Sequence, residues 1–168
     1  LVEGTPIIDV VARTAWLLGV ERLWVVARDH EIEFRRCCQR ISRKYELDAE
    51  THILPRATRT SLETLRSSVS LVDSPPVVLL GDDVTLAMSL LNLRRKFSLL
   101  KPAILQAVTQ ENDRRILIQT CQVIPGPGGL IGSIAEKPAI PSGGIRGCGI
   151  YLLGEPAFSY LSGSGASS

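Results

Sequence analysis

The chain has 168 residues, enough to bury the core of one domain with little room for a second. Hydrophobic residues make up 45% of it and charged residues 21%, which is ordinary for a globular protein and argues against disorder. The formal net charge of +2 is too small to indicate nucleic-acid binding, and no apolar run approaches the roughly 20 residues of a membrane span. We therefore expect a cytoplasmic protein without nucleic-acid or membrane partners.

The first half of the chain alternates the signals of helices and strands. The expected helices cover residues 5–18, 30–44, 61–72 and 85–96, and the expected strands cover residues 23–27, 49–54 and 77–80. Such alternation favours a parallel sheet whose strands are joined by right-handed helical crossovers.

The second half lacks helix signals. Apolar strand patterns occur at residues 103–108, 116–119, 121–124, 130–135 and 148–153. The glycine-rich and proline-rich segment 125–129 is typical of a hairpin turn, and its glycines do not match a dinucleotide-binding loop in register. The sequence thus predicts an α/β fold in which a mostly parallel sheet with flanking helices carries an antiparallel hairpin addition.

The cysteines and histidines give no sign of a zinc site. The four cysteines, two of which are neighbours, lack the paired spacing of metal ligands, and the histidines do not cluster with them. The cysteines are Cys37, Cys38, Cys121 and Cys148. We interpret all four as reduced packing residues.

The apolar run at residues 77–80 leads directly into Gly81, Asp82 and Asp83. A continuous apolar run is typical of a strand covered on both faces, and ligands of open α/β sheets bind beyond the carboxyl ends of such strands. The two carboxylates are therefore candidates for a site. An ordinary turn, with an aspartate that caps the next helix, is the alternative.

A second candidate is the tripeptide formed by Glu136, Lys137 and Pro138, at the end of an apolar strand. A carboxylate can accept hydrogen bonds from sugar hydroxyls, and a lysine ammonium can bind phosphate as a point charge. A surface ion pair is the alternative for this tripeptide.

Five short motifs occur in the order and approximate spacing of the sugar-phosphate nucleotidyltransferase family, which the chain resembles from Leu1 to about Leu161. They lie at residues 1–8, 18–23, 80–82, 136–138 and 147–153. The resemblance implies a Rossmann-like nucleotidyltransferase domain over residues 1–161, incomplete at both ends, and a flexible tail over residues 162–168.

Members of this family join a nucleoside triphosphate to a sugar 1-phosphate and release pyrophosphate. By resemblance, Asp82 would be a catalytic residue that binds Mg²⁺, which prefers carboxylate and phosphate oxygens. Glu136 would bind sugar hydroxyls, Lys137 would bind the sugar phosphate and act in catalysis, and Gly149 would let the backbone approach the sugar. Asp83 matches a position that varies in the family.

The chain also departs from the family pattern. The glycine-rich basic loop that cradles the triphosphate would precede Leu1, and a second metal-binding aspartate would follow Ser168. Where relatives carry a glutamine and a glycine for the base, this chain has Leu54 and Arg59. We therefore expect the 168 residues alone to show weak catalysis or none.

Two functions remain open at this point. The chain is an enzyme, or part of one, that makes a nucleotide sugar, with glucose 1-phosphate and UTP or dTTP as the expected substrates. Alternatively, it is a noncatalytic relative with a regulatory or assembly role. The sequence does not determine the base, the sugar or the oligomeric state, and it is compatible with a homo-oligomer.

Overall fold

The computed structural model describes residues 5–56, 58, 60–81 and 90–163. Its helices are α1 (Ile7–Leu17), α2 (Glu31–Tyr45), α3 (Ser61–Ser68), α4 (Leu90–Leu100), α5 (Arg114–Leu117) and α6 (Glu155–Ser162), with short 3₁₀ turns η1 (Val69–Leu71) and η2 (Pro127–Gly129). Its strands are β1 (Arg22–Ala27), β2 (Asp48–Ile53), β3 (Val77–Leu79), β4 (Ile104–Gln110), β5 (Cys121–Pro125), β6 (Ile131–Glu136) and β7 (Ile145–Leu153).

The described strands form two sheets. β1 and β2 pair in parallel, whereas β3, β4, β5, β6 and β7 form a five-stranded sheet in which every pairing is antiparallel. The α/β class with an antiparallel addition is confirmed. Parallel pairing is a smaller part of the described fold than the alternation of helices and strands predicts, because β3 pairs with β7 in the antiparallel sense.

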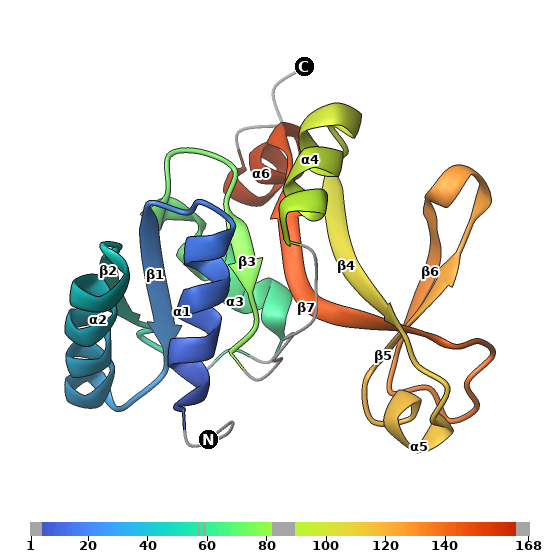
Figure 1. Ribbon diagram of the computed structural model, residues 1–168, viewed down its shortest axis with the longest axis horizontal. Coiled ribbons are helices and arrows are strands. Elements are labelled where there is room, and N and C mark those ends of the chain that lie inside the picture. The colour runs from blue at the N-terminus through green and yellow to red at the C-terminus, as the bar shows by residue number, and fades with distance from the viewer. Residues whose placement is uncertain (1–4, 57, 59, 82–89, 164–168) are drawn as a thin grey trace.

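Helix α1 connects the two sheets. Near its middle, Ala12 packs with Ile41 of α2 and with Leu47 before β2. Beyond its carboxyl end, Leu18 packs with Ile150 and Leu152 of β7, and side chains of β3 and α4 contact the same cluster. In Figure 1, α1 and α4 lie over one side of the sheets, while β5, β6 and α5 form an arm that projects away from the helices.

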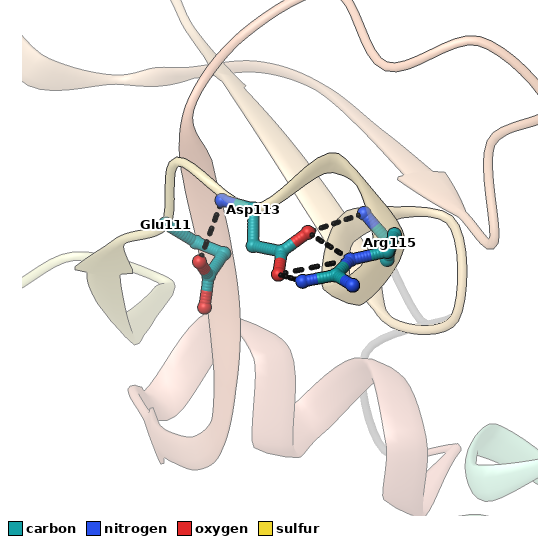
Figure 2. Close-up of polar contacts among 3 residues, drawn as sticks. All are labelled: Glu111, Asp113 and Arg115. Carbon is teal, nitrogen blue, oxygen red and sulfur yellow. Dashed lines mark hydrogen bonds and ion pairs between the residues drawn. The ribbon is translucent and has the colours of Figure 1, made fainter.

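One predicted strand is a helix. The sequence predicts a strand at residues 116–119, but α5 covers Arg114–Leu117. The Asp113 carboxylate accepts a hydrogen bond from the backbone N–H of Arg115 (2.9 Å) and forms an ion pair with the Arg115 guanidinium (2.7 Å), as Figure 2 shows. This cap satisfies a backbone donor that would otherwise lack a partner, so a local interaction overrides the apolar strand pattern.

Two other helices show features that the sequence does not predict. The sequence assigns residues 30–44 to a helix without the detail that α2 shows, in which Cys38 and Ile41 are buried whereas Ile32 is 64% exposed. The helix α6 was not expected; Gly154 precedes it and Pro156 occupies its first turn, where a missing N–H costs nothing.

All four cysteines are free, as expected, and two of them, Cys38 and Cys148, are buried. Within the described ranges, no helix has the length and apolar character needed to cross a bilayer.

Candidate functional site

The candidate site lies along β7. Two strands, β3 and β5, pair with successive parts of the same edge of β7. β4 pairs with both halves of β7, so β3, at residues 150–152, and β5, at Arg146, must both lie on the opposite edge. Residues 147–149 of β7 lie between the part that pairs with β5 and the part that pairs with β3. Two glycines in this short stretch, Gly147 and Gly149, keep it free of bulky side chains on one face.

Glu136 and Lys137 lie at the end of β6, which is separated from β7 by β5. Glu136 is paired with Cys121 of β5, and the register of β5 with β7 carries Cys121 on to Gly147. Lys137 adopts a left-handed backbone conformation, with φ +46°, and its N–H donates to the carbonyl of Thr120 at 2.8 Å. Both charged side chains are exposed, so they are available to a ligand.

Gly149 marks the other end of the site. Its carbonyl accepts a hydrogen bond from the backbone N–H of Leu80 at 2.8 Å, which aligns the end of β3 with it. Standard strand spacing and rise place Gly149 roughly 12 Å from Glu136 along the sheet, with one strand between them. Asp82 and Asp83 lie outside the described residues.

Sequence reasoning missed three side chains on the same face of the sheet. Gln106, opposite Tyr151 in the pairing of β4 with β7, donates from Nε2 to Tyr151 Oη at 3.2 Å. A Cβ at Gly147 would lie only 2.5 Å from Gln106 Nε2 and 3.1 Å from Cys121 Sγ. The site face is defined here as Gln106, Cys121, Glu136, Gly147 and Tyr151.

The Cys121 thiol is held in its neutral form by this surrounding. Burial raises its pKa, the negative charge of Glu136 raises it further, and a hydrogen bond from the Gln106 side chain lowers it by less. Cys121 is therefore no activated nucleophile, since the thiolate is the reactive form. It fills the floor of the site between Gln106 and Glu136, which agrees with its interpretation as a reduced packing residue.

The signal that could have revealed Gln106 is its position in an otherwise apolar run. Residues 103–108 alternate poorly, and one carboxamide stands among aliphatic side chains at a position that the structure buries to 7% exposure. Buried polar side chains are uncommon unless they have partners, so a lone glutamine in a predicted core strand indicates a position with a specific polar partner.

The positions that the resemblance assigns to the base and to a metal ion can be followed only in part. Leu54, where the resemblance leads us to expect a glutamine, is 7% exposed at the end of β2 and its N–H donates to Ala27. Arg59 lies outside the described residues. Among those that are described, no three His, Cys, Asp or Glu side chains come together as a metal site.

Comparisons with solved structures identify the fold. A UDP-glucose pyrophosphorylase complexed with UDP-glucose superposes with a TM-score of 0.72 at 15% identity, covering 94% of this chain and 67% of that one. An apo UDP-glucose pyrophosphorylase gives a TM-score of 0.66 at 18% identity, covering 95% and 68%. A structure assigned as a glucose-1-phosphate thymidylyltransferase of Bacillus anthracis, in complex with sucrose, gives 0.77 at 16% identity, covering 97% and 63%.

No family model matches the sequence, and no curated protein matches it. The chain spans about two thirds of the length of the solved structures that it resembles. At these levels of identity the comparisons concern the fold, and they agree with the resemblance found in the sequence motifs. The chain has a sugar-phosphate nucleotidyltransferase-like fold.

Proposed function

We propose that this chain is the nucleotidyltransferase domain, or a large part of it, of an enzyme that joins a nucleoside triphosphate to a sugar 1-phosphate. One observation carries the proposal: Glu136 and Lys137 at the end of β6 lie one strand away from the glycine-containing stretch of β7, within a fold like that of a UDP-glucose pyrophosphorylase complexed with UDP-glucose. Glucose 1-phosphate and UTP or dTTP are the proposed substrates.

The side chains of Glu136 and Lys137 suit a sugar 1-phosphate. The Lys137 ammonium binds the phosphate group, and the Glu136 carboxylate accepts hydrogen bonds from ring hydroxyls. A phosphate oxygen then attacks the α-phosphorus of the triphosphate, and the bond from that phosphorus to pyrophosphate breaks. Because no covalent enzyme intermediate is needed, the residues act by positioning and by charge neutralisation.

Asp82 is the proposed ligand of Mg²⁺ in this reaction. It follows the described end of β3, where Leu80 is hydrogen-bonded to Gly149. A carboxylate suits this hard cation, which neutralises phosphate charge when bound. Leu54, Arg59 and Asp83 have no assigned part in the chemistry.

A noncatalytic role in regulation or assembly is the second candidate. The buried aliphatic side chain of Leu54 favours it, because this position offers no hydrogen bond to a nucleotide base where the family pattern has a glutamine. A noncatalytic module of this kind would either bind the sugar phosphate without turnover or lose both the binding and the turnover.

Turnover separates the two candidates. Pyrophosphate release is measured with Mg²⁺, glucose 1-phosphate and UTP or dTTP, on this chain and on the complete product of its gene. Release above the enzyme-free rate supports the enzyme. If neither protein releases pyrophosphate while glucose 1-phosphate still binds, the noncatalytic candidate is favoured; if nothing binds either, the proposed function is wrong.

Two variants test the proposed role of Asp82 as a ligand of Mg²⁺. Asp82→Asn should abolish turnover in the active protein and leave its far-ultraviolet circular dichroism unchanged, whereas Asp83→Asn, one residue further on, should retain most of the activity. Activity of Asp82→Asn within a few-fold of wild type would remove Asp82 from the metal site.

A further inference from the structure

Gln106 carries a buried hydrogen-bonding atom that no described residue satisfies. Its Nε2 donates to Tyr151 Oη at 3.2 Å. Its Oε1, however, is buried without a partner in the described part of the chain. Because an unpaired buried carbonyl oxygen is costly, such atoms are rare in folded proteins and call for a physical reason.

The position of Gln106 suggests that reason. Its carboxamide lies over the backbone of Gly147, in the space where any other residue type would place a Cβ. Cys121 is next to it on the same face, and Glu136 is paired with Cys121 in turn. Gln106 and Glu136 therefore lie on the same face of the sheet, with Gly147 and Cys121 between them; Gln106 is buried and Glu136 is exposed.

We propose that Gln106 is a specificity-determining residue that hydrogen-bonds a ring hydroxyl of the sugar 1-phosphate. This inference rests on the proposed function and assigns part of its substrate selection to a residue outside the sequence motifs. A carboxamide both donates and accepts, as a hydroxyl does. The terminal torsion of glutamine is soft, so Oε1 can turn toward the ligand while the strand stays in place.

A hydroxyl in the wrong orientation would leave the carboxamide unpaired. A site built to hydrogen-bond a substrate hydroxyl discriminates strongly against compounds that lack it, since a buried polar group is then left without a partner. Epimers of one hexose phosphate differ in the orientation of a single hydroxyl. They should therefore bind with different affinities, and the difference should depend on Gln106.

The test is calorimetric titration of the full chain with glucose, galactose and mannose 1-phosphates and with inorganic phosphate. Wild type should prefer one epimer by about tenfold, the value of a typical hydrogen bond. Gln106→Met, which keeps the length of the side chain without its polar group, should lose that preference and leave phosphate binding unchanged. Gln110→Met, at an exposed position of the same strand, is the matched control and should behave as wild type.

Three results would overturn the inference. In the first, wild type binds the epimers equally. In the second, the Gln106→Met variant keeps the preference for one epimer. In the third, the Gln106→Met variant loses as much affinity for inorganic phosphate, relative to wild type, as it loses for the sugar phosphates. If wild type binds no sugar phosphate at all, the proposed function itself fails, which is a distinct outcome.

A second readout does not depend on the stability of the variant. The side-chain amide resonance of wild-type Gln106, assigned by residue-selective labelling, should shift when the preferred sugar 1-phosphate is added and stay in place with inorganic phosphate. A resonance that does not respond to any sugar phosphate that binds would overturn the inference even if Gln106→Met does not fold.

Discussion

The backbone N–H of Leu80 donates to the carbonyl of Gly149 at 2.8 Å, and this hydrogen bond joins the two most distant sequence motifs of the candidate site. Leu80 ends the apolar run that leads to Asp82, and Gly149 lies in the last strand. Since β5 pairs with β7 further along the same edge, Lys137 at the end of β6 completes the arrangement. The site is thus assembled by β7, which contacts every other strand of its sheet except β6.

The Lys137→Ala variant tests the proposed role of Lys137 in binding phosphate. Loss of a charged hydrogen-bond donor should weaken the binding of glucose 1-phosphate by about tenfold to hundredfold. Calorimetry measures this directly, and in an active protein the Michaelis constant for the sugar phosphate should rise by a similar factor.

Lys101→Ala is a close control for this variant. Lys101 and Lys137 have φ of 44° and 46°, and the N–H of each donates to a backbone carbonyl, so the cost of placing alanine in this conformation is the same. Lys101→Ala should bind glucose 1-phosphate as wild type does. Equal weakening by both substitutions would assign the effect to the backbone and would contradict the part given to Lys137.

Sequence reasoning located the elements better than their partners. Apolar periodicity correctly predicts α1, β1, β2 and the strands of the hairpin, because burial of one face determines these patterns. It does not report which strand lies beside which. The antiparallel pairing of β3 with β7 joins segments about 70 residues apart, and nothing local to either segment encodes it.

At the candidate site too, the sequence indicates single residues but not which residues lie next to one another. Glu136 and Lys137 can be proposed from the sequence because charged residues that end an apolar strand stand out, and in the structure they lie one strand away from the strand that holds Gly149. The role of Gln106 does not follow from its own segment, because it depends on Gly147 and Tyr151 of β7 and on Cys121 of β5. Pattern alone cannot show such a cluster, although a glutamine within an apolar strand is a usable signal.

The pairing of α1 with α2 depends on an ion pair that buries one partner. The Asp9 side chain is 8% exposed and its carboxylate accepts a hydrogen bond from Arg40 Nη2 at 3.0 Å, whereas the arginine side chain is 48% exposed. Arg40→Met would leave the buried carboxylate without this donor. The free energy of unfolding should fall by about 1–2 kcal/mol, less than for a fully buried pair because solvent screens the arginine.

Urea denaturation followed by circular dichroism measures this loss. Arg36→Met, on an exposed turn of the same helix, makes the same chemical change without removing a contact and should alter the unfolding free energy by less than about 0.5 kcal/mol. Equal effects of the two substitutions would show that the ion pair with Asp9 does not stabilise the fold.

Gly154 connects β7 to α6 at a place without room for a side chain. Its N–H donates to Ala103 at 2.7 Å, and a Cβ there would collide with the backbone carbonyl oxygen of Pro102. Since backbone cannot move aside as a flexible side chain can, Gly154→Ala should destabilise the chain by about 2–3 kcal/mol in urea denaturation. Gly143→Ala, whose Cβ would make only an ordinary contact at 3.5 Å, should cost far less. Similar losses for both would contradict the close approach at Pro102.

The cap of α5 gives the stability of the chain a dependence on pH. Hydrogen bonds from the Arg115 guanidinium, and then from its backbone N–H, lower the pKa of Asp113 below its usual range. The folded state therefore binds this proton more weakly than the unfolded state does. The stabilisation is present above the usual aspartate pKa of about 3.9 and is lost as the pH falls through the lower pKa of the folded state.

Asp113→Asn keeps an oxygen acceptor at the cap but removes the charge, so it isolates this contribution. Melting temperatures of wild type and variant should differ by a few degrees at pH 7, and the gap should narrow only below about pH 4. In an Arg115→Met background the gap at pH 7 should be smaller, because the largest cause of the lowered pKa has been removed. A gap that stays constant down to the most acidic conditions in which the protein folds would mean that the Asp113 charge does not act through this cap. The strand predicted at residues 116–119 would then have become a helix for another reason.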